Sequence, residues 1–366
     1  MSLLTVCYTD PEAGVRGYLV IDGLVRGVAA GGLRIHPAVS VDELTALARN
    51  MALKQQVAGI QVGGAKAGLA MDSAAPERRE VLRRFLGTLQ PLIEAMYSVG
   101  PDLGTTMAEL DSIGREAGIP CLKIAVGRSR GVSDAEFLRR YALLEQRVEG
   151  FTVNELRAAT AVQAAAAALA GALGVERPRV ALQGAGGVGG AAAWLLAREG
   201  ARIVAWADDE KCRKSDGGLD VRALLAARRG GRLPSAEAEQ APSAEVLRTP
   251  CDVLVLAAVS RAFGVEAVPR LACRGVVEAA NLALEPDVEE ALHAAGVLVV
   301  PDLIAGAGGS LAIEALYTAD LPTGPRDGQA ILDHVTRRAG ALARDCLARS
   351  RATGRTPRAA AMERVG

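Results

Sequence analysis

One glycine-rich segment, QGAGGVGG at residues 183–190, constrains the fold of this chain more than any other. It places Gly184, Gly186 and Gly189 in the spacing G-x-G-x-x-G, between the apolar run RVAL and the helix-like stretch AAAWLLAREG. The next apolar run, RIVAWAD, ends at Asp208. A strand, a glycine turn, a helix and a second strand ending in an acidic residue are typical of a unit that binds a dinucleotide. The segment therefore predicts such a site, with the pyrophosphate at the helix N-terminus.

Each residue of this motif has an expected role. Gly184 permits the tight turn, Gly186 lets the backbone approach the pyrophosphate, and Gly189 lets the helix pack on the strand. Asp208 is expected to accept hydrogen bonds from the adenosine ribose, which would repel a 2′-phosphate and favour NAD over NADP. The neighbouring Asp209 supports this prediction, although three cationic residues follow at 211–214.

The wider pattern predicts an α/β protein with two domains. From about residue 178, short apolar runs alternate with helical segments, which indicates a doubly wound parallel sheet of the Rossmann type. The polar stretch 227–245 is expected to be a surface excursion between two of these units. The predicted domains and segments are a substrate-binding and oligomerisation domain at 1–130, to which a helix at 326–350 is expected to pack back; a dinucleotide-binding domain at 131–325; and a frayed basic tail at 351–366.

Composition excludes several other classes of protein. The 366 residues include 42 basic and 42 acidic ones, and aromatic residues make up 3%, so neither a basic surface nor a stacking platform for nucleic acid is expected. The six cysteines are scattered singly, so no zinc or dithiol site is predicted and no metal is expected. The longest apolar run, at 158–175, is mainly alanine and predicts a buried helix, not a membrane span. We expect a cytoplasmic protein.

The first domain contains a lysine in an unusual setting. The segment GGAKAG at 63–68 surrounds Lys66 with glycine and alanine, and we expect a tight loop that holds this lysine away from solvent. Such a lysine is suited to act as a base near neutral pH. A helix at 41–58 with Ser40 as its N-cap, and a second helix at 76–96, are also predicted. The Pro and Gly of DPEAG, at 10–14, predict a hairpin turn.

Four motifs of this domain occur in a fixed order ahead of the glycine-rich turn. They are GGLR at 31–34, MALKQQ at 51–56, GGAKAG at 63–68 and GPDLGTTMAELD at 100–111. Together with VVEAANLAL and VVPDLIAGAGG near the end, this order resembles the glutamate/leucine/phenylalanine/valine dehydrogenase family over about residues 5–320. The last of the four motifs is most similar to the leucine and phenylalanine branch.

The resemblance implies roles for individual residues. Lys54 resembles the lysine that holds the substrate α-carboxylate, Lys66 the catalytic lysine, and Asp102 the aspartate that exchanges a proton with the amine. Thr160 is expected near the nicotinamide amide and Asn281 near its ribose, whereas Arg34 and His36 are expected to be structural. The residues expected to bind the cofactor are then Gly184, Gly186, Gly187, Val188, Gly189, Asp208, Thr160, Asn281 and Ala257. The implied reaction is the reversible oxidative deamination of an amino acid to a 2-oxo acid and ammonia by a homo-oligomer.

Two positions bear on the substrate. Glutamate-specific members carry a lysine before the first glycine pair and a serine after the later one, and these positions are Ala30 and Ile313 here. A substrate carboxylate left without partners would be rejected, so an apolar amino acid is predicted, leucine or valine ahead of phenylalanine. Gly32 and Leu33 are expected in the same pocket.

Some residues depart from the family pattern. Gly306 stands where the family has asparagine, and Ser260 and Arg261 stand where small or amide residues are usual. These departures leave two alternatives: a dehydrogenase for an unusual aromatic or non-proteinogenic amino acid, and a non-catalytic NAD-binding regulatory subunit. The joint presence of Lys54, Lys66 and Asp102 favours an enzyme.

Overall fold

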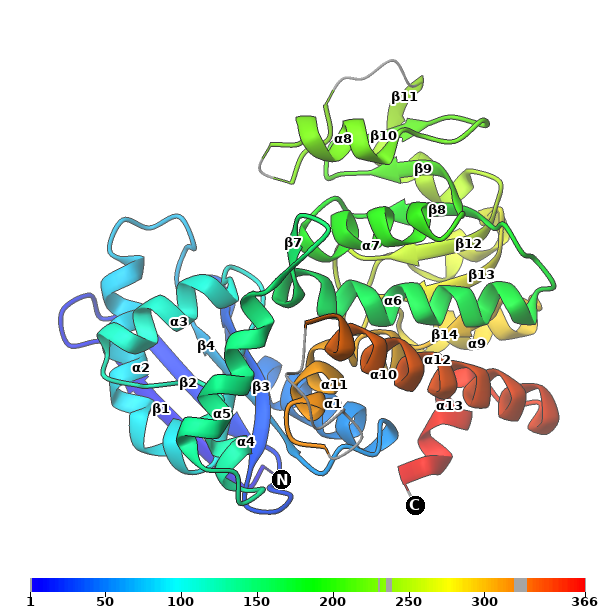
Figure 1. Ribbon diagram of the computed structural model, residues 1–366. Coiled ribbons are helices and arrows are strands. Elements are labelled where there is room, and N and C mark those ends of the chain that lie inside the picture. Colours follow the sequence, from blue (N-terminus) through cyan, green and yellow to red (C-terminus); the bar gives the residue numbers. More distant parts are fainter. Residues whose placement is uncertain (1, 230, 235–238, 319–327, 366) are drawn as a thin grey trace. The chain divides into compact units, whose positions relative to one another are not determined.

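The chain divides into two compact units in the computed structural model (Figure 1). Unit 1 comprises Met1–Leu143 and Leu316–Ala319, and unit 2 comprises Leu144–Ala315 and Asp320–Gly366. The boundary near 143 lies later than the predicted one at 130. The structure describes residues 2–229, 231–234, 239–318 and 328–365.

Within the described residues, unit 1 is built on a mixed five-stranded sheet in the order β1-β2-β4-β3-β5. Its strands are β1 (Leu4–Thr9), β2 (Arg16–Ile21), β3 (Ala29–Ile35), β4 (Gly63–Leu69) and β5 (Tyr97–Pro101). β1 and β2 form the predicted antiparallel hairpin, and its turn contains Gly14 at φ +66°. β3 pairs in parallel with both β4 and β5, which brings the motifs GGLR, GGAKAG and GPD together.

Helices cover both faces of this sheet. Helix α1 (Val41–Val57) packs on β4, and it starts at Ser40, whose hydroxyl accepts a hydrogen bond from the Glu43 amide at 3.2 Å, as predicted. The helices α2 (Arg78–Ala95) and α3 (Met107–Glu116) enclose the main apolar core on the opposite face. Two shorter helices follow, α4 (Ile124–Arg128) and α5 (Asp134–Tyr141).

The segment GGAKAG is a strand and not the predicted loop. It forms β4 in the middle of the sheet, and all seven residues of β4 are buried. Its glycines permit close packing, because a Cβ on Gly64 would stand 2.2 Å from the carbonyl oxygen of Ala48 on α1. The small residues therefore bring helix and sheet together, and the buried strand fixes the backbone at Lys66.

Unit 2 contains the predicted doubly wound sheet, with seven strands among the described residues in the order β11-β10-β9-β8-β12-β13-β14. β9, β8, β12, β13 and β14 are parallel, whereas β10 is antiparallel to both of its neighbours. The strands are β8 (Arg179–Gln183), β9 (Arg202–Ala207), β10 (Lys211–Lys214), β11 (Glu239–Pro242), β12 (Cys251–Leu256), β13 (Cys273–Glu278) and β14 (Leu298–Val300). Part of the predicted excursion at 227–245 is thus the edge strand β11, and 230 and 235–238 lie outside the described residues.

The helices α6 (Val153–Ala172) and α7 (Gly187–Arg198) pack side by side against this sheet, and α9 (Pro286–Ala294) packs with the apolar cluster of its other face. The remaining helices are α8 (Val221–Ala227), α10 (Asp302–Ala305), α11 (Gly308–Ala315), α12 (Gly328–Thr353) and α13 (Pro357–Met362).

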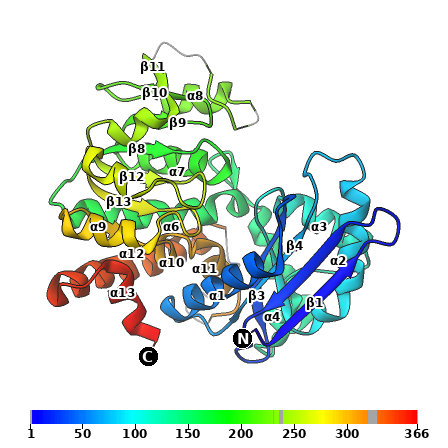
Figure 2. The ribbon, with the colours of Figure 1, turned by 180° about the vertical axis from the view of Figure 1, so that it is seen from behind.

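The C-terminal region differs from its prediction in two ways. Helix α12 packs along α6 in unit 2 and does not complete unit 1 (Figure 2). The tail is not frayed, because α12 continues to Thr353 and α13 follows with Ala360 and Ala361 fully buried. The helix predicted at 326–350 begins at Gly328, and 326–327 lie outside the described residues.

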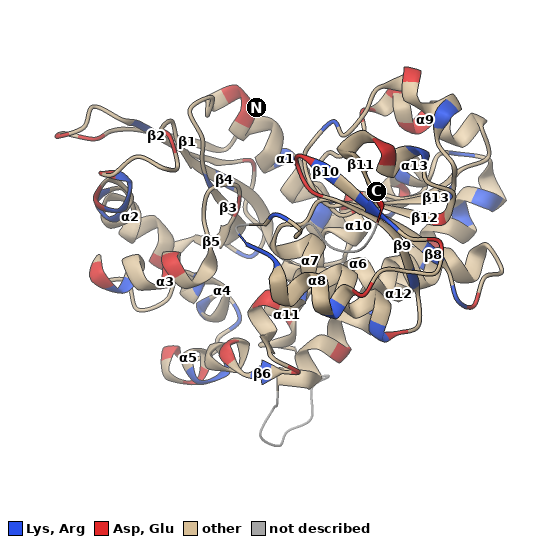
Figure 3. Cartoon of the chain, turned by 90° about the horizontal axis from the view of Figure 1, so that it is seen from above, with Lys and Arg blue, Asp and Glu red and all other residues tan. Residues whose placement is uncertain are grey.

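Charged residues of both signs are interspersed over the helices (Figure 3). Helix α5, for example, carries two acidic residues in its first turn and two arginines in its last. In the described parts of the chain, no helix is both long and apolar enough to cross a membrane.

Candidate functional site

A charged cluster lies on one face of the sheet in unit 1. Asp102, which directly follows β5, places Oδ2 2.6 Å from Lys66 Nζ and 3.0 Å from Arg34 Nε. We call these three residues the Asp102 cluster. The register explains it: Arg34 on β3 pairs with Gly68 on β4, two positions after Lys66, and side chains two residues apart share a face. All three side chains are largely buried, with 3–13% of their surface exposed.

The two cations determine the protonation of Asp102. Burial alone would raise the pKa of this carboxyl, but the charges of Lys66 and Arg34 outweigh burial and lower the pKa to about 2. The backbone amide of Asp102 donates to Thr105 Oγ1, whose hydroxyl donates to the carbonyl of Leu33 on β3. Asp102 is therefore an oriented carboxylate at neutral pH.

Arg34 contacts the candidate catalytic carboxylate, whereas the sequence predicted only a structural role for it. Besides contacting Asp102, its Nη1 donates to Glu43 Oε1 on α1 at 2.6 Å. Arg34 thus links the carboxylate to the first turn of α1. Its position two residues after Gly32, on the face of Lys66, is the sequence signal that would have identified it.

Lys54 is buried, although a lysine on an amphipathic helix is normally solvated. It lies near the end of α1, the helix that packs on the strand of Lys66, and its residue surface is 2% exposed. A buried ammonium on this helix suits the proposed binding of a substrate carboxylate.

The residues predicted to form the side-chain pocket separate into two groups. Ala30 and Gly32 lie on the face of the Asp102 cluster, because Gly32 is paired with Gly100, two positions before Asp102. A Cβ on Gly32 would stand 2.8 Å from the Cβ of Asp102, so this glycine makes room for the carboxylate. Leu33 points to the opposite face and is fully buried in the apolar core, so its predicted place in the pocket is wrong. Ile313 lies in α11 of unit 2, where it is largely buried.

The glycine-rich turn of unit 2 has the geometry that a dinucleotide requires. Gly184 adopts φ +106°, and a Cβ on Gly189 would stand 2.1 Å from the carbonyl oxygen of Gly184. Gly186 and Gly187 are exposed, and among the described residues nothing lies within 4 Å of a Cβ built on either. Helix α7 begins here, and no described side chain caps it, so its first amides can receive a pyrophosphate. The residues present therefore fit this cofactor.

Asp208, which is predicted to bind the adenosine ribose, is buried and bonded to the backbone. Its Oδ1 accepts from the amides of Glu210 and Lys211, its Oδ2 accepts from the amide of Leu233, and its side chain is 3% exposed. Burial would raise the pKa of Asp208, but these amides and then Arg213 lower it. The carboxylate thus organises the loop after β9. Asp209, at 68% exposed, is the more accessible acidic residue.

Arg228 is a residue of this half-site that the sequence prediction missed. Its Nη1 donates to the carbonyls of Ala185 and Gly186 at 2.7 and 2.9 Å. It follows α8 in the polar excursion, and its folding back onto the glycine turn has no local sequence signal. The contact places a guanidinium beside the expected position of the pyrophosphate.

The other predicted cofactor residues lie at or near this sheet. The Ala257 amide donates to Gln183 at the end of β8, and Val188 is in the first turn of α7. Thr160, on α6, donates its hydroxyl to Leu156 of the same helix. The Asn281 carbonyl accepts from Ser260 Oγ at 2.8 Å, so the unusual serine joins the turns after β12 and β13.

The remaining family departures have local roles. Arg261 adopts φ +54° and pairs with Glu285 on the surface. Gly306 ends α10, and its amide donates to the carbonyl of Asp302.

A second charged cluster lies deep in unit 2, and the sequence prediction missed it completely. The guanidinium of Arg358 on α13 contacts three buried carboxylates; these four residues, which we call the Arg358 cluster, are Arg358, Glu278, Glu289 and Asp302. The second oxygens of two of them accept from the amides of Leu282 and Leu284, in the turn that carries Asn281. The cluster therefore ties α13 to this turn.

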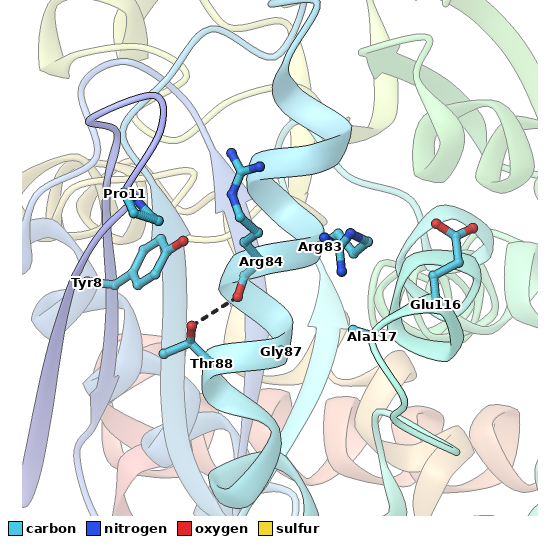
Figure 4. A pocket seen from close by; sticks show the side chains of 8 residues that line it. All are labelled: Tyr8, Pro11, Arg83, Arg84, Gly87, Thr88, Glu116 and Ala117. Carbon is cyan, nitrogen blue, oxygen red and sulfur yellow. Dashed lines mark hydrogen bonds between the residues drawn. The ribbon is translucent and has the colours of Figure 1, made fainter.

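A surface pocket of about 490 Å³ lies elsewhere in unit 1, between β1, α2 and α3 (Figure 4). Its arginines are already paired: Arg84 with Asp10, and Arg83 with Glu80. The small residues Gly87 and Ala117 leave the hollow. It shares no lining residue with the Asp102 cluster, and nothing in its chemistry suggests catalysis.

Both units of the chain match known proteins. Residues 155–363 match the model of the glutamate/leucine/phenylalanine/valine dehydrogenase family, and residues 5–117 match its dimerisation domain. Glutamate dehydrogenase of Thermotoga maritima is 31% identical over 80% of this chain and 70% of its own length. NADP-specific glutamate dehydrogenase A1 of Halobacterium salinarum is 32% identical over 78% and 67%. The solved hetero-hexameric glutamate dehydrogenase from Thermus thermophilus, in its Leu-bound form, is similar with a TM-score of 0.82 and 29% identity, covering 100% of this chain and 87% of that one.

Proposed function

This chain belongs to the glutamate/leucine/phenylalanine/valine dehydrogenase family, and we propose that it catalyses the reversible oxidative deamination of an L-amino acid to a 2-oxo acid and ammonia. The observation that carries the proposal is the Asp102 cluster: a buried lysine 2.6 Å from a carboxylate, on the sheet face that α1 and Lys54 cover. The dimerisation-domain match supports an oligomer of this chain.

The residues of unit 1 act on the amino acid in this proposal. Lys54 binds the α-carboxylate, and hydride acceptance is the chemistry that a nicotinamide dinucleotide supplies when bound. Lys66 takes a proton from the water that attacks the imine carbon, and Asp102 passes a proton to the departing amine. Lys66 must be neutral to act as a base, and a neutral Lys66 no longer lowers the pKa of Asp102. The two groups are therefore suited to exchange one proton.

For the cofactor, we propose NAD. The support shifts from Asp208, which is buried, to Asp209 and Glu210, whose exposed carboxylates follow β9 and would disfavour a 2′-phosphate, although Arg232 pairs with both of them. The opposite influence is Arg232, whose guanidinium lies beside these two carboxylates and would favour a 2′-phosphate. Because one relative is named NADP-specific, both cofactors belong in the test.

Two substrate classes have support. Ala30 and Ile313 favour an apolar amino acid such as leucine or valine, because neither can pair with a side-chain carboxylate. The names of the relatives described above favour glutamate instead.

The test measures reduced cofactor from NAD or NADP with a panel of L-amino acids, for the wild type and Lys66→Ala. Arg79→Ala, which removes an exposed cation of unit 1, is the matched control. We expect turnover of at least one amino acid, its loss in Lys66→Ala, and no change in the control. Dinucleotide binding without turnover of any amino acid would instead support a non-catalytic regulatory subunit.

A further inference from the structure

The turn at residues 279–284, which we call the Asn281 turn, lies at the same edge of the unit 2 sheet as the glycine-rich turn. It follows β13, and the glycine-rich turn follows β8; both strands are parallel to β12, which lies between them. The amide of Ala280 donates to the carbonyl of Leu256 at the end of β12 at 2.8 Å. Ligands of such sheets bind outside the carboxyl ends of the strands. The Asn281 turn is therefore placed to contact the part of the dinucleotide beyond the pyrophosphate.

The backbone of this turn has a conformation that needs support. Leu282 adopts φ +50°, which residues other than glycine rarely adopt and which persists only where surrounding contacts hold it. Its amide donates to Asp302 Oδ2 at 3.1 Å, and its carbonyl accepts from the amide of Arg261 at 2.9 Å. The amide of Leu284 donates to Glu278 Oε2, also at 3.1 Å. Two carboxylates thus hold the turn by its amides.

The guanidinium of Arg358 holds the other oxygen of each of these carboxylates. Its Nη2 lies 2.8 Å from Asp302 Oδ1 and 3.3 Å from Glu278 Oε1, and Glu289 on α9 contacts its Nε at 2.5 Å. The side chains of Asp302 and Glu278 are fully buried, and buried carboxylates need a cation and hydrogen-bond donors. One guanidinium from α13 therefore fixes both groups that hold the turn.

We propose that Arg358 is a positioning residue for the dinucleotide. Through Asp302 and Glu278 it keeps Leu282 at positive φ, and this conformation places Asn281 to bind the nicotinamide ribose. The inference rests on the proposed function, because it concerns the cofactor of that reaction. The pyrophosphate is expected at the glycine-rich turn, two strands away, so binding of the adenosine and pyrophosphate should not depend on Arg358.

The experiment is calorimetric titration of the full chain with NADH and, separately, with ADP, which lacks the nicotinamide ribose. If the turn of Arg358→Met is correctly folded about a tenth of the time, its Kd for NADH rises about 10-fold. Its Kd for ADP should stay within about 2-fold of the wild-type value, because ADP does not reach the Asn281 turn. Arg358→Lys, which keeps the charge, should recover part of the NADH affinity. Arg364→Met, which removes a more exposed arginine of the same segment, is the matched control and should bind both ligands as the wild type does.

A second pair of variants tests the turn while Arg358 stays in place. Valine and asparagine are similar in size, but β-branched valine strongly disfavours positive φ and asparagine adopts it readily. Leu282→Val should therefore raise the Kd for NADH about 10-fold without changing the Kd for ADP. Leu282→Asn should bind NADH more tightly than Leu282→Val. These variants keep the test valid if Arg358→Met does not fold.

Two results would overturn the inference. One is a Kd for NADH that is unchanged in Leu282→Val or in folded Arg358→Met; the other is an equal rise for NADH and ADP, which would assign the Arg358 cluster only to holding unit 2 together. Because these titrations contain no amino acid, they separate this inference from the proposed function. A protein that turns over no amino acid, yet selectively loses NADH binding in these variants, would support the role of Arg358 and reject the dehydrogenase activity.

Discussion

The two buried charged clusters of this protein contain the same chemical groups in opposite proportion. In the described residues of the Asp102 cluster, two cations contact one carboxylate; in those of the Arg358 cluster, one guanidinium contacts three carboxylates. Burial raises a carboxyl pKa in both places. Yet the pKa of Asp102 falls to about 2, whereas burial and the neighbouring carboxylates raise the pKa of Glu278 well above its usual range, against the effect of Arg358.

Burial raises the carboxyl pKa in both clusters, and the number of cations in contact decides whether their charges outweigh it. Direct contact with two cations keeps Asp102 ionised and suits this carboxylate to proton exchange. An excess of carboxylates makes the Arg358 cluster retain a proton, and its fully buried members hold the chain together. The first cluster is therefore expected to control activity and the second to control stability.

The largest expected effect is the loss of activity in Lys66→Ala. Removing the proposed base should lower kcat about 10,000-fold, because general acid–base catalysis contributes up to about that factor. Asp102 keeps Arg34 as a partner, so the melting temperature should change little. Turnover and thermal unfolding measured on the same preparation check both parts. Turnover at the wild-type rate would remove Lys66 from the mechanism.

Asp102→Asn should lower kcat about 1,000-fold, because the amide neither accepts nor returns a proton. It should also change acid unfolding. Since the folded pKa of Asp102 lies below its ordinary value of 3.8, its ion pairs stabilise the fold above that pH, and this stability is lost as pH falls towards about 2. Between pH 5 and pH 2, a range that includes both pKa values, the free energy of unfolding should therefore fall less steeply in the variant than in the wild type. Equal slopes would contradict the low pKa.

These two residues also show how far the sequence could predict the site. The order of the motifs was enough to select Lys54, Lys66 and Asp102, and the strand–turn–helix context was enough for the Rossmann sheet. The conformation of GGAKAG was not predicted, because a glycine-rich run favours a turn locally while β4 uses its glycines to contact α1. Residue propensities describe only the local chain, so they could not predict that α1 packs against this strand.

Contacts between distant segments were the other part that the sequence could not supply. Arg358 lies in a basic tail without clear periodicity, and its nearest partner in the chain, Asp302, is 56 residues away. Leu33 lies in the apolar core on the face opposite to Gly32, because alternate residues of a strand point in opposite directions. The burial of Asp208 could not be predicted, because the segment that covers its carboxylate returns from Leu233.

Arg358→Met tests the stabilising role of the second cluster. Removing the guanidinium leaves three buried carboxylates without their cation, so the free energy of unfolding should fall by about 3 kcal/mol. Arg358→Lys should recover part of this loss. Arg364→Met removes a more exposed pair with Asp345 on the same C-terminal segment and should cost less than about 1 kcal/mol. Urea unfolding measures all three, and equal losses in Arg358→Met and Arg364→Met would reduce the cluster to a surface contact.

The smallest expected effect is a change in the pH dependence of stability in Glu278→Gln. Because the folded pKa of Glu278 is raised, the folded state keeps a proton that the unfolded chain has lost, and this stabilisation declines as pH rises through the folded pKa. The glutamine mimics the protonated carboxyl at every pH, so the variant should gain about 1 kcal/mol relative to the wild type between pH 6 and pH 8. In the control Glu290→Gln, on the exposed side of α9, the free energy of unfolding should depend on pH as it does in the wild type. If Glu278→Gln also shows the wild-type pH dependence, Glu278 is ionised throughout this range, and the proton of the Arg358 cluster resides on Glu289, whose pKa burial also raises.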